Sequence, residues 1–547
     1  MKNRFLNIAL LFLLITVSKS AFAWNVIDSA TRGGKANSPN ICRNLNNNGS
    51  LSASVWVKDS ASTSIAGIRF FEVDDNGLKI NEKLFRLTYP LAGGGTVKRI
   101  ELHRILVNYN SNSYVVLGTA HKPSPGFPTT LAFLFEVDNT LNKRKVKFLD
   151  EYFNYYDFTI TPLTGQVACV GTIGIFNRLK VPSRRGVITT LDSNFSCTGL
   201  NLMEQSLPGV GNIPRFDNIK VIKSYLDAGS NQEFLFISGH ITRDTTIAGI
   251  TNFIPQVFVS KLLINNLGGL TNLWYRVLNS HFSIFSPMDQ VIPCDLLYDE
   301  NRNYLVLVSS SNDLSGGAFE NAHLTILYAN SGNYINNIRF KGPGVSSLII
   351  PFTDLVYAQS IYLKSTGNYC IQGWANFYNN GAIGLLNRFN FYQVDFDPNS
   401  LTFDSMQLVL GTSIGYIASQ PRDIYGLFTD TGYTHGSTFH SLGLYCTPHA
   451  MTCFIDSNGN NQAVVAWLST ENVTNHKLRL WSSKNGRGDG LLGCKLPKLE
   501  VIATLNTITA ELRSTNWDYI PCYEFPVGGD YQIQIDFNTQ DCTGTYD

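Results

Sequence analysis

Histidine, acidic and cysteine residues cluster at one place in the second half of the chain. His435, His440 and His449 lie close together in the sequence, near Asp430 and Cys446, and could supply metal ligands or a general base. Their spacing matches no metal-binding motif, and the segment around them is polar. We therefore interpret these residues as surface loop residues, and we predict neither a metal site nor a catalytic residue here.

A calcium loop is a second possibility. Asp456–Asn461 carries alternating side-chain oxygens, which is the ligand type that calcium prefers. Gly459 comes too early for such a loop, and no glutamate stands at the closing position, so a hairpin turn is the better interpretation. The chain also has no HExxH motif and no phosphate loop, and we assign no nucleophile elbow or dinucleotide fingerprint. We expect no cofactor.

The glycine-rich segment Asn485–Gly490 contains the tripeptide Arg487-Gly488-Asp489. This tripeptide resembles the integrin-recognition motif, in which a tight turn presents a cation and a carboxylate at opposite ends. A flexible turn with no binding role is the alternative, because loop tips often have this composition. We keep Arg487, Gly488 and Asp489 as candidate binding residues.

Two long loops and an aromatic cluster could form a further binding surface. One loop is basic, a second is acidic, and the aromatic residues could stack on a sugar or fill a protein groove. For the aromatic residues, packing inside the protein is the alternative. The candidate residues are Arg178, Lys180, Arg184, Arg185, Asp313, Glu320, Trp374 and Tyr378.

A repeat organises the segments that must position these residues. Five segments share a polar turn, four extended residues and then a small residue, at spacings of 53, 68, 70 and 64 residues. A hairpin turn such as Val137–Thr140 or Leu191–Asn194 follows each of them. Each unit therefore predicts four strands joined by turn, loop and turn. The small residues are Gly118, Gly171, Gly239, Ser309 and Gly373.

Repeated four-stranded antiparallel sheets are typical of β-propeller blades. The turn followed by Tyr-Val-x-Gly resembles the repeat of secreted bacterial β-propeller proteins, over about residues 50–415. The resemblance implies a fold and no catalytic residues. We predict an all-β protein, a β-propeller of about seven four-stranded antiparallel blades with a disulfide-rich C-terminal region. The glycines would stand where strands crowd near the centre. A pair of β-sandwiches is the alternative.

The N-terminal residues indicate export. Lys2 and Arg4 precede the apolar run Phe5–Val17, and Ala21-Phe22-Ala23 fits a signal-peptidase site. We therefore predict a signal peptide at residues 1–23 and a protein that is secreted, held at the cell surface or periplasmic. The propeller would span residues 24–505, with an insertion around 413–450. Residues 506–547 would supply closing strands or a small disulfide-held cap.

The chain has ten cysteines, all after the predicted signal peptide. Export into an oxidising compartment favours disulfides over a metal site, and the sequence does not select a pairing. Half of the cysteines lie beyond residue 440, so we expect the C-terminal region to depend most on disulfides. The cysteines that we predict to form disulfides include Cys169, Cys197, Cys446, Cys453, Cys494 and Cys522.

The charge balance restricts the partners. With 42 Lys and Arg, 41 Asp and Glu and a net charge of +1, the chain offers no field that would attract nucleic acid. No later apolar run is long enough to insert into a membrane. The prediction is an exported, non-enzymatic protein that binds a protein or glycan through its loops, in adhesion or cell-envelope organisation. The alternative is a secreted or periplasmic hydrolase or lyase with a site at the propeller channel. The oligomeric state stays open.

Overall fold

A computed structural model gives the fold, and all of its described secondary structure is β-strand. The first described strand begins at Trp24, directly after the predicted signal-peptidase site. Among the described residues, no helix has the length and apolar character needed to cross a membrane. The described residues are 24–27, 35–59, 64–86, 99–122, 129–149, 153–173, 185–203, 217–227, 229–247, 250–280, 290–313, 319–341, 355–377, 388–404, 406–411, 451–455, 461–472, 475–484, 498–499, 501–506, 508–513, 515 and 517–520.

The described strands pair into seven antiparallel sheets. We number the sheets 1 to 7 in the order in which their innermost strands occur along the chain. Sheet 1 contains β2 (Lys35–Arg43), β3 (Gly49–Asp59), β4 (Ser64–Asp74) and β5 (Lys79–Arg86); sheet 2 contains β6 (Arg99–Asn108), β7 (Ser113–Lys122), β8 (Thr129–Asp138) and β9 (Lys143–Phe148). Sheet 3 contains β10 (Phe153–Ile160), β11 (Val167–Ile173), β12 (Gly186–Leu191), β13 (Cys197–Met203) and β33 (Trp517–Ile520); sheet 4 contains β14 (Asn218–Asp227), β15 (Gln232–Ile247), β16 (Ile250–Ile264), β17 (Leu270–Ser280) and β32 (Ile508–Arg513). Sheet 5 contains β18 (Gln290–Asp299), β19 (Tyr304–Asp313), β20 (Phe319–Tyr328), β21 (Tyr334–Lys341) and β31 (Ile502–Asn506). Sheet 6 contains β22 (Leu355–Leu363), β23 (Tyr369–Phe377), β24 (Arg388–Asp397), β26 (Met406–Gly411) and β30 (Lys498–Leu499), with β25 (Thr402–Phe403) on β24; sheet 7 contains β27 (Met451–Ile455), β28 (Asn461–Asn472), β29 (Asn475–Lys484) and β1 (Trp24–Ile27).

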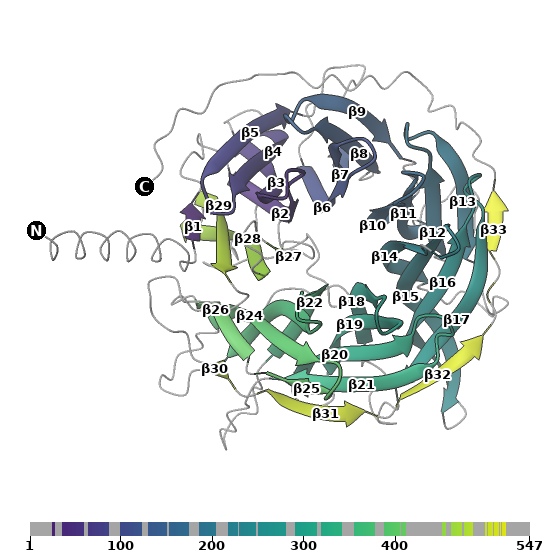
Figure 1. The fold of residues 1–547 in the computed structure, drawn as a ribbon. Helices are drawn as coiled ribbons and strands as arrows, with labels where there is room; N and C mark the ends of the chain where they lie inside the picture. Colours follow the sequence, from purple (N-terminus) through teal and green to yellow (C-terminus); the bar gives the residue numbers. More distant parts are fainter. Residues whose placement is uncertain are drawn as a thin grey trace, which may run out of the picture.

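The sheets stand side by side around a common axis, with the first strand of each sheet innermost (Figure 1). Sheet 7 contacts both ends of this series, because β27 contacts β22 on one side and β2 on the other. Its outermost strand, β1, comes from the N-terminal end of the described chain and pairs with β29. The fold is therefore a β-propeller built from four-stranded antiparallel units, as the repeat predicts.

The hydrophobic core lies between sheets rather than within any one of them. Strand β7 shows why the second strand of each repeat is a continuous apolar run. Tyr114 and Val116 pack toward sheet 1, whereas Val115 and Leu117 pack toward sheet 3. Since successive side chains of a strand point to opposite faces, a sheet that is buried on both faces needs apolar residues at every position. A single sheet would expose half of this surface, so neighbouring sheets stabilise each other.

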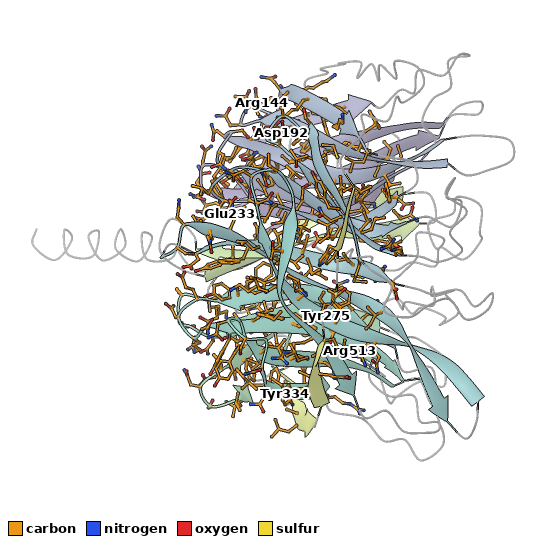
Figure 2. All side chains as sticks on the ribbon, turned by 90° about the vertical axis from the view of Figure 1, so that its right-hand side faces the viewer. Arg144, Asp192, Glu233, Tyr275, Tyr334 and Arg513 are labelled. Carbon is orange, nitrogen blue, oxygen red and sulfur yellow. The ribbon has the colours of Figure 1, made fainter. Side chains whose placement is uncertain are left out.

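Antiparallel pairing places the connections at two opposite ends of the ring. The short turns from first to second strand and from third to fourth strand form one end, which we call the turn face. The connections from second to third strand and from sheet to sheet leave at the other end, which we call the loop face. In the side view of Figure 2, Asp192 and Glu233 lie on the turn face. The described strands on either side of the predicted rim loops end at the loop face.

Left-handed backbone at one position explains the polar turn of the repeat. In sheets 1 to 6, a residue one or two positions before the second strand has a positive φ, which glycine and asparagine adopt most readily. This requirement is the physical origin of the Asn or Gly that precedes the extended residues. The positions are Asn47, Asn112, Gly165, Asn231, Asn303 and Gly367.

The second turn of sheets 1, 2, 3, 4 and 6 is held by an acidic or amide side chain. Asp138 Oδ1 accepts the backbone N–H groups of Thr140 and Asn142, at 2.9 and 2.7 Å. Leu141 within this turn has a φ of +61°, a costly conformation for leucine, and its side chain is fully buried. Burial of a leucine is worth about 1.5–3 kcal/mol, which offsets a strain of about 1–2 kcal/mol. Asp192 and Phe195 repeat the arrangement in sheet 3.

The C-terminal strands β30–β33 add as further strands to sheets 6, 5, 4 and 3. We call these four strands the belt. β30 pairs with β26, β31 with β21, β32 with β17 and β33 with β13, so the belt runs along the outside of the ring from sheet 6 to sheet 3 (Figure 1). Residues 521–547 lie outside the described residues.

Candidate functional site

The first strands of sheets 2 to 6 each contain a β-bulge of one residue. Each bulge lies opposite the small residue that ends the extended motif of the second strand, for example Leu102 opposite Gly118 and Ile219 opposite Gly239. A bulge bends a strand and changes the direction of nearby side chains. The five bulged residues, which we call the inner ring, are His103, Tyr156, Lys220, Cys294 and Gln359.

The bulges explain the glycines of the repeat. A Cβ atom at Gly171 would lie 1.9 Å from the carbonyl oxygen of Asn154, and one at Gly239 would lie 2.0 Å from that of Asn218. Both carbonyls belong to the bulged inner strand, so backbone rather than a side chain occupies the space. The prediction that strands crowd at this position is confirmed in sheets 3 and 4. In sheet 5, Ser309 takes the equivalent position opposite Pro293.

A buried ion pair follows the bulge in sheets 2 and 3. Arg104 Nη1 lies 2.6 Å from Asp157 Oδ1 and 2.7 Å from Asp157 Oδ2, and the Asp157 side chain is completely buried. Asp157 Oδ2 also accepts the backbone N–H of Ile222 from sheet 4, at 3.0 Å. Burial lowers the pKa of the Arg104 guanidinium, but Asp157 and Asp295 raise it by more, so this pKa lies above its ordinary value. The guanidinium therefore stays charged, and its contact with Asp157 helps to hold three sheets together.

Neighbouring inner strands meet through two further contacts. Lys220 Nζ lies 3.6 Å from the ring centroid of Tyr156, so the two inner-ring residues of sheets 3 and 4 form a cation–π contact. Lys223 Nζ lies 3.1 Å from Asp295 Oδ1 and joins sheet 4 to sheet 5. Lys220 and Lys223 therefore bind to residues of neighbouring inner strands.

The cysteine and histidines near the inner strands are poor catalysts at neutral pH. Burial raises the pKa of the Cys294 thiol to about 12, so the nucleophilic thiolate is scarce. Burial lowers the pKa of His240 to about 4, and the imidazole bridges Asn218 and the Val291 carbonyl oxygen. Within the described ranges, no group of three or more His, Cys, Asp and Glu residues could hold a metal ion. The polar side chains of the inner strands join neighbouring sheets.

Arg185 is the one predicted rim residue whose side chain the structure describes. It is half-buried, and its Nε donates to the Met203 carbonyl oxygen at 2.9 Å, between the start of β12 and the end of β13. This contact anchors Arg185 to its own sheet at the edge of the loop face.

Three other predicted binding residues are placed by their backbone alone. Asp313 ends β19 opposite Phe319, and Glu320 lies opposite Asn312, so both stand at the loop-face end of sheet 5. Trp374 lies within β23, between Tyr357 and Phe391, rather than in a loop. The other predicted binding residues fall outside the described residues: Arg178, Lys180, Arg184, Tyr378, Arg487, Gly488 and Asp489.

The cysteines divide into two kinds. Cys197, on β13, is disulfide-bonded. The prediction of a disulfide at Cys169 is wrong, because Cys169 is a free thiol that is completely buried in β11 between sheets 2 and 3. Its side chain behaves as a small apolar group in the core. The remaining predicted disulfide residues are not described at the level of their side chains: Cys446, Cys453, Cys494 and Cys522.

The charged residues that follow the bulges are functional positions that the sequence-based predictions did not include. A signal for them exists, because Arg104, Asp157 and Asp295 each lie 14 residues before the small residue of their repeat (118 − 104, 171 − 157 and 309 − 295). A charged residue at a fixed offset inside an otherwise apolar strand indicates a buried partner. Nothing in the sequence, however, names that partner.

Comparisons with known proteins give similarity of fold only. No protein-family model matches the chain, and no curated protein sequence is similar to it. A glucose dehydrogenase structure is 12% identical, with 62% of this chain and 94% of that chain covered and a TM-score of 0.29. The periplasmic gluconolactonase PpgL of Pseudomonas aeruginosa is 9% identical, with coverages of 71% and 94% and a TM-score of 0.27. A GH43_12 protein from a capybara gut metagenome is 12% identical, with coverages of 88% and 95% and a TM-score of 0.25. The chain resembles these β-propeller proteins in fold, and scores this low carry no inference about activity.

Proposed function

We propose that the chain is an exported, non-enzymatic binding protein that uses its loop face to hold a protein or a glycan, in adhesion or in organisation of the cell envelope. The observation that supports the proposal is a division of roles within the molecule: the inner strands join neighbouring sheets, whereas the connections between strands lie on the loop face. Polar groups of the inner strands are engaged between sheets, as in the pair of Arg104 and Asp157. We also propose that the ring is complete with seven blades, each of which sends connections to the loop face.

A long ribbon marks the loop face in sheet 4. Strands β15 and β16 stay in register from Phe234 opposite Leu263 to Ile247 opposite Ile250. β17 pairs with β16 only as far as Val257, so Gln256 and the residues before it extend past the body of the sheet. A paired ribbon holds its shape better than an open loop, which suits it to contact a partner.

The test is retention of a ligand by the full chain. Immobilised protein would be offered to a glycan array and to extracts of surface proteins. The informative variant removes residues 244–253 and joins Arg243 to Ile254 through Asn-Gly, which closes a two-residue hairpin in the existing register. The matched control is Leu267→Ser on the turn face, where Leu267 is 76% exposed. We expect the ribbon variant to lose the retained ligand and the control to keep it.

The competing function is a secreted or periplasmic hydrolase or lyase that acts at the centre of the ring. A broad hydrolase screen of the same preparation distinguishes the two functions. If the protein turned over a substrate and retained no ligand from the glycan array or from the protein extracts, the binding proposal would be contradicted. Export has its own test: the N-terminal sequence of the exported protein should begin at Trp24.

A further inference from the structure

The belt advances by one sheet at each strand. It pairs first with sheet 6, then with sheets 5, 4 and 3, and its last described strand, β33, ends at Ile520. The next sheet in this direction is sheet 2, whose outer strand is β9. The described residues place no strand on the outer edge of β9. An open sheet edge presents unpaired N–H and C=O groups to any extended chain.

The outer edge of β9 differs in charge from edges that the belt covers. β9 contains Lys143, Arg144, Lys145 and Lys147, whereas the strands that the belt covers contain fewer basic residues: none in β13 and β26, Arg276 in β17, and Arg339 and Lys341 in β21. Arg144 and Lys145 share one buried carboxylate, Glu136, at 3.8 and 3.0 Å, and their side chains are 41% and 30% exposed. The edge therefore has an excess of positive charge.

The chain that follows the belt has the opposite charge. Residues 521–547 contain no Lys or Arg, and their acidic residues are Glu524, Asp530, Asp536, Asp541 and Asp547. Within them, Tyr531–Phe537 alternates apolar and polar residues, which is the pattern of a strand with one buried face. Residues 521–530 bridge the gap easily, because ten extended residues reach about 33 Å. The described belt passes from β32 to β33 with only residues 514–516 between them.

We propose that Tyr531–Phe537 adds to β9 as the outer strand of sheet 2, so that the belt continues to this sheet. Three observations lead to this occupant: the order of the belt strands, the basic open edge of β9 and the acidic strand pattern beyond Ile520. Opposite charges on adjacent strands favour the pairing. Lysine on an exposed edge also prevents unwanted pairing with other molecules, so the same residues would select an acidic strand over a neutral one.

Hydrogen exchange of the full chain, followed by mass spectrometry, tests the proposal. We expect slow exchange in peptides that cover 143–148 and 531–537. The variant Ile533→Pro/Ile535→Pro removes two backbone donors from the tail strand, so both peptides should exchange faster, by roughly tenfold or more. Thr543→Pro, in the same tail but outside the predicted strand, should leave both peptides unchanged. Peptides from β8 and β11 report on the fold in every variant.

A charge exchange distinguishes this pairing from a merely structural effect of proline. Arg144→Glu/Lys147→Glu should lose the slow exchange of the 531–537 peptide, and adding Asp530→Lys/Asp536→Lys should restore it. Fast exchange of 531–537 in the unmodified chain would overturn the proposal. Slow exchange of the β9 amides that point away from β8, if it survives the Ile533→Pro/Ile535→Pro substitutions, would also overturn it, because another occupant would then cover that edge. Measurement of the oligomeric mass would show whether that occupant is a second copy of this chain.

Discussion

Asp157 and Asp295 make the same pair of backbone hydrogen bonds in two alternate sheets. In each residue, Oδ1 accepts the N–H of the following residue, and Oδ2 accepts an N–H from the next sheet, that of Ile222 or Ile361. Each carboxylate also contacts a cation from the preceding sheet, Arg104 or Lys223. One aspartate thus links three successive sheets near the axis, where their inner strands converge.

Loss of Arg104 tests this linkage. Arg104→Met should lower the free energy of unfolding by about 3–5 kcal/mol, because the buried Asp157 carboxylate then lacks its cation. Asp157→Leu removes the partner and also leaves the N–H of Ile222 without its acceptor. The double variant should lose less than the sum of the single losses, in a double-mutant cycle measured by urea denaturation.

The control for this cycle is Arg144→Met on β9, whose ion pair with Glu136 is longer and more exposed. Lys145 still pairs with Glu136 in this variant, and the Arg144 side chain is partly exposed, so we expect a loss of at most about 1 kcal/mol. If Arg104→Met costs no more than Arg144→Met, the inner ion pair does not hold the sheets together.

The glycine at the bulge should be sensitive to a single methyl group. Gly239→Ala places a Cβ against the Asn218 carbonyl, and relief of the overlap requires movement of backbone. We expect a loss of at least about 1–3 kcal/mol in the free energy of unfolding. Gly229→Ala is the matched control, because its Cβ would meet only the Asp227 Oδ1 atom, at 3.4 Å. Equal stability of the two variants in thermal denaturation would contradict the steric explanation.

Two buried histidines predict a loss of stability in mild acid. Burial lowers the pKa of His240 to about 4, helped by nearby Lys220, and burial together with Arg339 lowers the pKa of His323 to about 4. In the unfolded chain these histidines titrate near pH 6.5. Between these values the unfolded chain binds more protons, so the free energy of unfolding is fully present above pH 6.5 and falls as the pH falls toward 4. We expect a loss of about 2 kcal/mol for each imidazole between pH 7 and pH 5.

Chemical denaturation at the two pH values measures this loss. His240→Gln keeps a side-chain amide that can donate to the Val291 carbonyl oxygen but does not titrate. The difference in the free energy of unfolding between pH 7 and pH 5 should therefore be smaller in this variant, by about the 2 kcal/mol expected for one histidine. A variant that keeps the full difference would show that other groups cause the pH dependence.

The cysteines predict a distinct pattern of chemical modification. Cys42 and Cys169 are buried free thiols, and burial raises the pKa of both, so a thiol reagent should modify them only after unfolding. Cys197 should appear in a cross-linked peptide when a non-reduced digest is analysed by mass spectrometry.

Cys197→Ser should then lower the free energy of unfolding by about 2–5 kcal/mol. Cys169→Ser serves as the control for loss of a sulfur atom without loss of a disulfide. Rapid labelling of Cys169 in the native protein would contradict its position in the core.

Local chemistry is what made the strands and turns predictable from the sequence. Asn112 and Gly165 mark turns because few residues adopt a positive φ, and Asp138 marks the second turn because its carboxylate holds nearby N–H groups. The apolar run of β7 indicates a strand that is buried on both faces. Each of these signals lies within a few residues of the structure that it specifies. The repeat of hairpins, and hence the propeller, therefore followed from the sequence.

Only the tertiary structure decided which distant groups meet. Arg104 and Asp157 are far apart in the sequence, and a bulge in each inner strand brings them into one buried pair. The belt strand Ile508–Arg513 resembles any other strand in composition, yet it pairs with β17 after a long separation along the chain. Cys169 and Cys197 are likewise indistinguishable by residue type, and the packing of the sheets leaves the first as a free thiol in the core. Backbone pairing and burial depend on what the rest of the folded chain places opposite a segment, and a local pattern of residues does not contain that information.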